Sequence, residues 1–453
     1  MKRYEEYKPM KYEWLPEIPA HWETRTMRSF TTVSSERRGD REATLLSVYR
    51  EYGVVIKASR DDNRNVESED LSNYKWVRPG DLVMNKMKMW QGSLGVSEHE
   101  GIVSPAYIVC RINDATLNRR YLHTLLRSTG FKTYYNQYSY GVRVGQWDMH
   151  YEDFKGLEIA LPPRDEQDQI VRYLDWQVSK INRLIAAKRK QIAVLQEQQK
   201  HRISDAVLRG VGDNISLKDS GEEWIGEIPE HWNVIRCKYV FSERDERSVA
   251  GEEEHLSMSQ KYGLVPDSKL DERRMLSESY AGGKICYEDD LVLNRLKAHL
   301  GVFALAPQKG VISPDYTVLV PNTERILPAY GEAVLKSDLC RRELRIRVRG
   351  IIEGFWRLYT DDFNTIVIPL PPLGEQQRIM DYLSALNEKF VALKQNLEQE
   401  IATLQDFRTR MISDVVTGQV DVRGIEVPEY EIVEDTETGG ESEADTEGEE
   451  YEE

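Results

Sequence analysis

Clustered arginines give this sequence its clearest chemical potential. Residues 341–350 read Arg-Arg-Glu-Leu-Arg-Ile-Arg-Val-Arg-Gly, with five arginines in nine residues. Arg345, Arg347 and Arg349 alternate with apolar residues, so a strand would project all three from one face. Like charges on one face repel one another unless a polyanion neutralises them, and guanidinium groups match phosphates and guanine edges. The pattern favours nucleic-acid contact, and a solvated basic face is the alternative.

A second basic pattern occurs twice, each time beside an asparagine. Its residues are Lys86 and Lys88 in one segment, and Arg295 and Lys297 in the other. The apolar residues before each group are typical of a strand, so the basic side chains should stand on a strand and the turn that follows it. We expect them to contact phosphates.

The stretch that corresponds to the arginine run, residues 132–143, is rich in tyrosine instead. Tyr134 and Tyr138 are four residues apart, as on one face of a helix, so core packing and DNA contact both remain open. Tyr138 and Arg143 are the candidate DNA-binding residues of this stretch.

Catalytic and cofactor motifs are missing from the sequence. It has neither a Gly-x-x-x-x-Gly-Lys phosphate loop nor a Gly-x-Gly-x-x-Gly turn. Two Leu-Pro-Pro segments look superficially like an amino-methyltransferase signature, but Leu161 and Leu370 stand where that chemistry needs a polar side chain. His21 and His231 precede tryptophans at a repeated position, which favours a structural role over metal ligation. We expect a non-catalytic chain with no bound metal or cofactor.

Composition excludes other classes of protein. The chain of 453 residues is 40% hydrophobic and 30% charged, and no apolar run approaches the roughly 20 residues of a membrane span. The first residues lack the apolar core of a secretory signal. The four cysteines have no Cys-x-x-Cys spacing, which argues against a zinc ribbon or a disulfide framework. We expect a cytoplasmic protein with no membrane partner.

The net charge of −16 is unevenly distributed. Residues 426–453 hold 14 acidic residues and no basic one, which leaves a charge of −2 for the first 425 residues. This segment has few apolar residues to offset its ordering entropy, so we interpret it as a disordered, solvated tail. A competitor for a basic surface is the alternative.

Internal repetition determines the expected architecture. Segments recur at a shift of 209 or 210 residues: 14–22 at 224–232, 81–88 at 290–297, 101–107 at 310–316, 145–147 at 354–356 and 161–163 at 370–372. The chain is therefore a tandem duplication of a module of about 210 residues. Where the copies agree, a residue serves the scaffold or a shared partner. The copies diverge most at 132–143 against 341–352 and at 89–100 against 298–309, which is typical of two readers with different targets.

Each module has a globular part and a long helix. The globular parts, residues 1–162 and 224–371, have short β-rich runs split by turns, so we predict a mixed α/β (α+β) fold. The Pro-Pro pairs then predict the starts of helices over 163–209 and 372–418, each with an apolar stripe and no internal proline or glycine after its first turn. A stripe about 65 Å long favours an antiparallel coiled coil of the two helices. The alternative is that each helix packs on its own globular part. Residues 210–223 are a linker and 419–453 a C-terminal segment.

Four motifs together resemble the specificity subunit of type I restriction-modification enzymes. They are the Trp-x-Gly-Glu-Ile-Pro-x-His-Trp opening, the Gly-Ile-Val-Ser-Pro-x-Tyr segment, the Leu-Pro-Pro-x-x-Glu-Gln helix start and the closing segment 417–423. The resemblance covers about residues 11–425. Two departures are Lys8–Trp14, which replaces the Ser-Gly segment that the second copy keeps at Ser220-Gly221, and the acidic tail.

The resemblance implies that each globular part is a target recognition domain for one half of a split, asymmetric site in double-stranded DNA. It implies that the helices set the spacing and dock two adenine-N6 methyltransferase subunits, and that two ATP-dependent restriction-translocase subunits complete the complex. S-adenosylmethionine, ATP and Mg²⁺ would bind those partners and not this chain. A two-module protein-binding adaptor, or a specificity subunit for a fused nuclease-methylase, are the alternatives.

Overall fold

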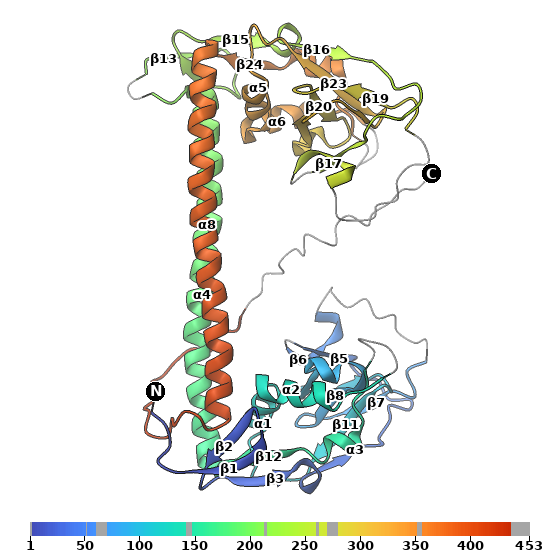
Figure 1. Ribbon diagram of the computed structural model, residues 1–453, viewed down its shortest axis with the longest axis vertical. Coiled ribbons are helices and arrows are strands. Elements are labelled where there is room, and N and C mark those ends of the chain that lie inside the picture. The colour runs from blue at the N-terminus through green and yellow to red at the C-terminus, as the bar shows by residue number, and fades with distance from the viewer. Residues whose placement is uncertain are drawn as a thin grey trace. The chain divides into compact units, whose positions relative to one another are not determined.

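The chain folds into two compact units. The structure, a computed structural model, describes residues 2–50, 52–59, 70–141, 147–212, 215–259, 262–269, 280–350 and 356–435. Unit 1 consists of Met1–Arg189 with Glu398–Glu453, and unit 2 consists of Lys190–Leu397. Unit 1 therefore combines the blue and the red ends of the chain in Figure 1.

Unit 1 is built from short strands and short helices around antiparallel sheets. Its strands are β1 (Tyr7–Tyr12), β2 (Leu15–Pro19), β3 (Glu23–Thr26), β4 (Thr31–Val33), β5 (Leu46–Tyr49), β6 (Gly53–Ile56), β7 (Lys75–Val77), β8 (Leu82–Asn85), β9 (Leu94–Val96), β10 (Gly101–Val103), β11 (Tyr107–Ile112) and β12 (Glu158–Leu161). Its helices are α1 (Arg119–Leu126), α2 (Thr129–Gln137) and α3 (Tyr151–Phe154), with 3₁₀ helices η1 (Met27–Ser29), η2 (Lys57–Ser59) and η3 (Lys86–Gln91). The main sheet has the order β4-β11-β8-β9, and β1-β2, β3-β12, β5-β6 and β7-β10 pair separately.

Unit 2 repeats this plan. Its strands are β13 (Leu217–Asp219), β14 (Glu227–Pro229), β15 (Asn233–Arg236), β16 (Phe241–Arg244), β17 (Leu256–Ser259), β18 (Gly263–Pro266), β19 (Lys284–Cys286), β20 (Leu291–Asn294), β21 (Phe303–Leu305), β22 (Gly310–Ile312), β23 (Tyr316–Pro321) and β24 (Val367–Leu370). Its helices are α5 (Pro328–Lys336), α6 (Asp338–Arg347) and α7 (Thr360–Thr365), with η4 (Cys237–Tyr239), η5 (Asp267–Lys269) and η6 (Ala298–Leu300). The main sheet has the matching order β16-β23-β20-β21.

Strand register is conserved between the copies as well. Tyr107 on β11 lies opposite Asn85 on β8, and Tyr316 on β23 lies opposite Asn294 on β20. The strands β8 and β20 are almost wholly buried, which explains their continuous apolar runs. The duplication and the mixed α/β class that the sequence predicts are therefore confirmed at the level of sheet topology.

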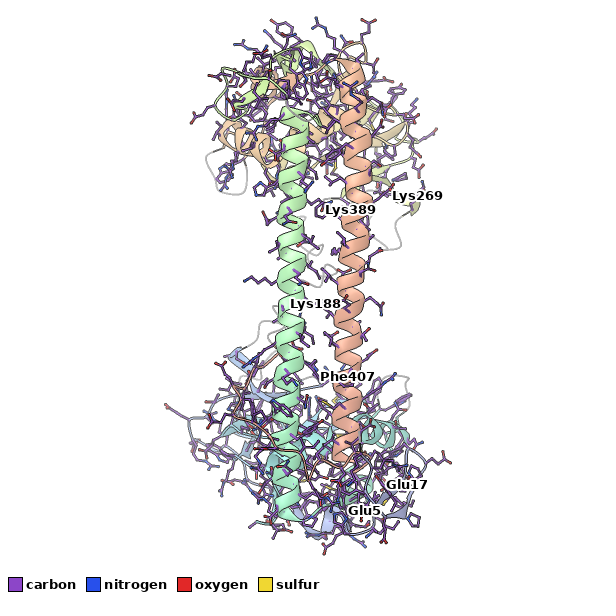
Figure 2. The ribbon with its side chains drawn as sticks, turned by 90° about the vertical axis from the view of Figure 1, so that its left-hand side faces the viewer. Glu5, Glu17, Lys188, Lys269, Lys389 and Phe407 are labelled. Carbon is purple, nitrogen blue, oxygen red and sulfur yellow. The ribbon has the colours of Figure 1, made fainter. Side chains whose placement is uncertain are left out.

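Two long helices run antiparallel within each unit. Helix α4 spans Arg164–Arg209 and α8 spans Leu373–Val416, so unit 1 holds the start of α4 with the end of α8, and unit 2 the reverse. In unit 1, Arg408 Nη1 donates to Asn182 Oδ1 at 2.7 Å, and Lys188 pairs with Glu400. Figure 2 shows Lys188 on α4 and Phe407 on the neighbouring α8. The antiparallel coiled coil is confirmed.

Both helices also join the globular cores. In unit 1, Ile181 and Ile185 of α4 share one apolar cluster with Met411 of α8 and with residues of the main sheet. In unit 2, Ile379 and Leu383 of α8 share a cluster with the last turns of α4. The alternative of helices packed on their own globular parts is therefore also partly realised, because the apolar stripes extend into the units.

A buried glutamate joins the repeated opening motif to the repeated helix start. Trp22 Nε1 and Tyr4 Oη donate to Glu166 Oε1 at 3.0 and 2.6 Å, and His21 Nε2 lies 2.8 Å from Oε2. The first turn of α4 supplies this glutamate, and Trp22 is fully buried. The histidine is thus satisfied by a carboxylate, as a structural residue should be.

Unit 2 contains the same arrangement. Trp232 Nε1 donates to Glu375 Oε2 and His231 Nε2 lies beside Glu375 Oε1, both at 2.7 Å. Burial would raise the pKa of Glu375, but the hydrogen bonds from Trp232 and His231 outweigh it and lower that pKa. The two sequence motifs therefore recur together because they form one contact.

The beginning of the acidic segment departs from our expectation of a solvated tail from Glu426 onward. Asp435 pairs with Arg189 at 3.0 Å and Arg408 at 2.7 Å, and Asn182 Nδ2 donates to the Val433 carbonyl at 2.8 Å. Val427 packs against the apolar core. Isolated valines and the arginines of α4 and α8 thus hold residues 426–435 against unit 1. The rest of the acidic segment, residues 436–453, lies outside the described residues.

The cysteines are all buried thiols. Burial raises the pKa of both Cys110 and Cys286 to about 12, so they behave as small apolar residues. No helix within the described ranges is sufficiently long and apolar to traverse a membrane.

Candidate nucleic-acid interface

The two pairs of segments that diverge most between the copies come together in the structure. Helix α2 packs on η3 in unit 1, and α6 packs on η6 in unit 2. Gly92 and Gly301 end the two 3₁₀ helices in the left-handed conformation, with φ of 86° and 77°. The left-handed backbone favours glycine at both positions, and a Cβ there would press on the flexible side chains of Lys132 at 3.0 Å and Arg341 at 3.1 Å. We define the α2–η3 face and the α6–η6 face as the candidate interface.

Repeated asparagines build the turn that carries the lysines. Asn85 Oδ1 accepts a hydrogen bond from the Met87 amide at 3.2 Å, and Asn294 Oδ1 accepts one from the Leu296 amide at 3.1 Å. Each asparagine is the last residue of a strand of the main sheet. These side chains are occupied by the turn, so their function is to orient the basic residues that follow.

The four basic residues of these turns fall into two pairs. Lys86 Nζ lies 2.9 Å from Asp148 Oδ2, and Arg295 Nε donates to the Asp315 carbonyl at 2.6 Å. Lys88 and Lys297 are exposed, and within the described ranges neither has a carboxylate partner. These two lysines can therefore contact a polyanion without first breaking an ion pair.

Tyrosines line the α2–η3 face of unit 1. Tyr134 is buried, whereas Tyr138 is 46% exposed and stacks on it with ring centroids 4.3 Å apart. Core packing therefore holds for Tyr134, and one face of Tyr138 remains accessible. Tyr140 is 58% exposed; slight desolvation and the Asp153 carboxylate raise its pKa, so the hydroxyl stays protonated and can donate. Arg143 lies outside the described residues.

The arginine run forms a helix, and our prediction of a strand with three arginines on one face is wrong. Helix α6 extends to Arg347, and its N-cap Ser337 accepts a hydrogen bond from the Cys340 amide. Cys340 and Leu344 are buried four residues apart, so the helical period of the apolar residues prevails over the alternation at its end.

The three arginines have different surroundings. Arg345 is exposed with no carboxylate partner in the described part of the chain. Arg347 pairs with Glu343 one turn earlier on α6. Arg349 follows the helix, is 70% exposed at its side chain and pairs with Asp362. The structure thus places all three near the α6–η6 face but not on one strand.

Two carboxylates of the interface were not identified from the sequence. Asp153 and Asp362 occupy equivalent places in α3 and α7, at the 209-residue shift. Their agreement between the copies was the available signal. Among the described residues, no group of three His, Cys, Asp or Glu side chains could hold a metal ion.

Comparisons with known proteins agree with this arrangement. Residues 237–403 match the model of the type I restriction modification DNA specificity domain. The chain is 24% identical over 439 residues to a putative type I restriction enzyme MjaX specificity subunit of Methanocaldococcus jannaschii, covering 90% of this chain and 95% of the relative. It is 25% identical over 285 residues to the type I restriction enzyme MjaVIII specificity subunit of the same organism, covering 60% and 64%. A solved structure from work on complex assembly and conformational transition of the type I R-M system has a TM-score of 0.60 at 15% identity, covering 89% of this chain and 99% of that one, which shows a shared fold.

Proposed function

We propose that each unit reads one half of a bipartite, asymmetric DNA target. The premise is that residues 237–403 match the DNA specificity domain of type I restriction-modification systems, and that the chain resembles a specificity subunit over nine-tenths of its length. The resemblance that the sequence motifs indicate is confirmed by these comparisons. The proposed readers are the recognition domains, residues 1–162 and 224–371.

One observation carries the proposal. Two copies of one scaffold, with matching sheet order and matching glutamate contacts, carry tyrosines on the α2–η3 face and arginines on the α6–η6 face. Phosphate contacts position a protein on DNA, and base contacts distinguish one sequence from another. A shared scaffold with unlike faces suits a target whose two halves have different sequences.

The helices and the partners complete the proposal. We propose that α4 and α8, within residues 163–209 and 372–418, set the length of the unread gap and dock two adenine-N6 methyltransferase subunits. Residues 210–223 would link the copies, and residues 419–453 would close unit 1. Two ATP-dependent restriction-translocase subunits would join in the cytoplasm. S-adenosylmethionine, ATP and Mg²⁺ would be held by those partners.

The test is to reconstitute the chain with a type I adenine-N6 methyltransferase subunit and to sequence the methylated adenines. We expect two methyltransferase subunits per chain and a split target with one sequence in each half. The chain alone should methylate nothing in the presence of S-adenosylmethionine. Methylation by the chain alone, or a continuous symmetric target, would contradict the proposal.

A two-module protein-binding adaptor is the alternative from another class. Duplex binding that weakens steeply as salt rises separates the two, because phosphate neutralisation releases counterions. A salt-independent complex with protein and none with DNA would favour the adaptor. Neighbouring genes would show whether the nuclease and methylase partners are separate or fused.

A further inference from the structure

In each unit one exposed side chain contacts an aspartate at an equivalent position, although the chemistry of the exposed side chain differs between the units. Tyr140 Oη lies 3.4 Å from Asp153 Oδ2 in unit 1. At the equivalent position of unit 2, Arg349 pairs with Asp362 Oδ1. The shift of 209 residues relates both partners, so the copies keep the acceptor and exchange the donor.

The backbone around these side chains is also the same in both units. Tyr140 exchanges two backbone hydrogen bonds with Asp148, at 3.1 and 3.0 Å. Arg349 exchanges two with Arg357, at 2.9 and 2.8 Å. These bridges fix the Cα positions of residues 140 and 349, while their side chains remain 58% and 70% exposed. A fixed backbone with an exposed side chain is the arrangement that reading requires.

Both aspartates are partly buried, and Asp362 faces the protein more than the solvent. The Asp362 side chain is only 15% exposed, and Oδ2 is buried with no hydrogen-bond donor in the described part of the chain. DNA at the surface would therefore meet Arg349 and not the carboxylate. Any effect of Asp362 on recognition has to pass through the arginine that it holds.

Stabilisation of the fold is a weak explanation for this pair. Ion pairs that involve an exposed arginine contribute little to stability, because they are solvated and restrict a long side chain. The same restriction of the arginine side chain favours DNA binding, because the side chain then loses less rotamer freedom when it contacts DNA. Asp362 engages Nη2 of Arg349, and the remaining N–H donors of a guanidinium so held can match O6 and N7 of guanine.

We propose that Asp153 and Asp362 are positioning residues that orient a variable reading side chain, Tyr140 in unit 1 and Arg349 in unit 2, toward the base edges of the target. Arg349 reads a guanine in the major groove, and the Tyr140 hydroxyl contacts a base of the other half-site. This assignment rests on the proposed function and names the residues that carry it out.

The experiment compares Asp362→Asn with Asp361→Asn in the chain reconstituted with its methyltransferase. Asp361 is exposed on the same turn of α7, so the control removes the same charge without touching Arg349. We expect D362N to lower the preference for one guanine in one half-site by about tenfold, with the other half-site and the melting temperature unchanged. D361N should keep the whole target.

A double-mutant comparison tests whether Asp362 acts through Arg349. Arg349→Ala should relax the same position, and adding D362N to R349A should change nothing further. If D362N does not fold, Arg349→Lys decides, because lysine keeps the charge and loses the fork. In unit 1, Asp153→Asn should relax one position of the other half-site only.

Results that contradict the positioning role differ from results that contradict the proposed function. A target unchanged in a folded D362N, a target unchanged in R349K, or a loss of affinity equal for all sequences would overturn the positioning role while the split target of the parent chain still stood. A parent complex without a split target would instead remove the proposed function itself.

Discussion

At the scale of residues, the two copies place different chemistry on equivalent helical positions. Tyr134 and Tyr138 stack in unit 1, whereas at the equivalent positions of unit 2 Glu343 and Arg347 form an ion pair. Both are contacts between residues four apart on one helix, so the helix geometry is kept while its surface changes from aromatic to charged. Recognition can then diverge without any change in the scaffold below.

Arg345 and Arg347 should respond differently to replacement by alanine. Arg345→Ala should weaken binding to every duplex alike and lower the salt slope by about one, because an exposed, unpaired arginine is suited to a phosphate. Arg347→Ala should mainly cost about 0.5 kcal/mol of helix stability, since its partner is Glu343. Titration of target and scrambled duplexes at several salt concentrations measures the first effect, and thermal unfolding the second. If R345A lost binding preference at one base position only, the phosphate assignment would be contradicted. Arg209→Ala, which removes another exposed arginine, is the control.

The contact between Glu375 and Trp232 should make unit 2 sensitive to acid. The lowered pKa of Glu375 means that its ionised form is favoured in the folded state, so this stabilisation is present above pH 4.5 and is lost as pH falls through the lowered value. Glu375→Gln should reduce stability by about 1–2 kcal/mol at pH 7 and by less below pH 4.5. Hydrogen exchange of peptides around Trp232 measures the change. Glu230→Gln, which changes an exposed neighbour, is the control and should have no effect. A stability difference between the parent chain and Glu375→Gln that grows toward low pH would refute the assignment.

Only part of the interface could be predicted from the sequence. The apolar strands predicted before the turn lysines are present, although Lys86 and Lys88 lie on the 3₁₀ helix η3 and not on a strand. Lys88 and Lys297 are exposed, and their contact with phosphate stays a prediction. The arginine run was misread because Arg-Ile-Arg-Val-Arg is too short to distinguish a strand from a helix end. Its N-cap, Ser337, lies eight residues before the alternation begins. Asp362 gave no local signal, because its role depends on a partner 13 residues away.

At the scale of elements, the long helices were the most predictable part of the fold. More than 40 residues without proline or glycine, with an apolar stripe, specify a helix whatever surrounds it. The order β4-β11-β8-β9 could not be predicted in this way, because β4 and β11 are about 80 residues apart in the chain and short strands carry little pairing information. The segment 426–435 was missed because its valines are isolated among acids.

Deleting one heptad should test the coiled coil. Removing 190–196 from α4 alone should prevent assembly, because pairs such as Gln199 with Asn387 and Lys188 with Glu400 would lose register. Removing 391–397 from α8 as well should restore them and shorten the helices by about 10 Å. At 3.4 Å per base pair, the unread gap should shrink by about three base pairs. Methylation sequencing measures the gap; an unchanged gap in an active double deletion would show that the helices do not set it.

At the scale of the whole molecule, the duplication predicts that the two halves of the target can be exchanged separately. Replacing residues 224–369 with the same block of a relative should change one half-site and leave the other intact. The block ends before the Pro371-Pro372 start of α8, so both helices and the Glu375 side chain are retained. Sequencing of methylated sites in the chimera tests this. A change in both halves would mean that reading is shared between the units.

Unit 1 is completed by residues from both ends of the chain, and this has a consequence during synthesis. The Asp421 amide donates to the Lys2 carbonyl, Tyr121 Oη donates to the Val416 carbonyl, and Ile181 and Ile185 share a cluster with Met411. All residues of unit 2, by contrast, have been made before residue 398 is added. At about 5–20 residues per second, the apolar stripe of nascent α4 waits on the order of 10–50 s for its partner from α8. The half that is translated first is thus the last to be completed, and during that interval the apolar stripe of α4 is a surface for chaperones to protect.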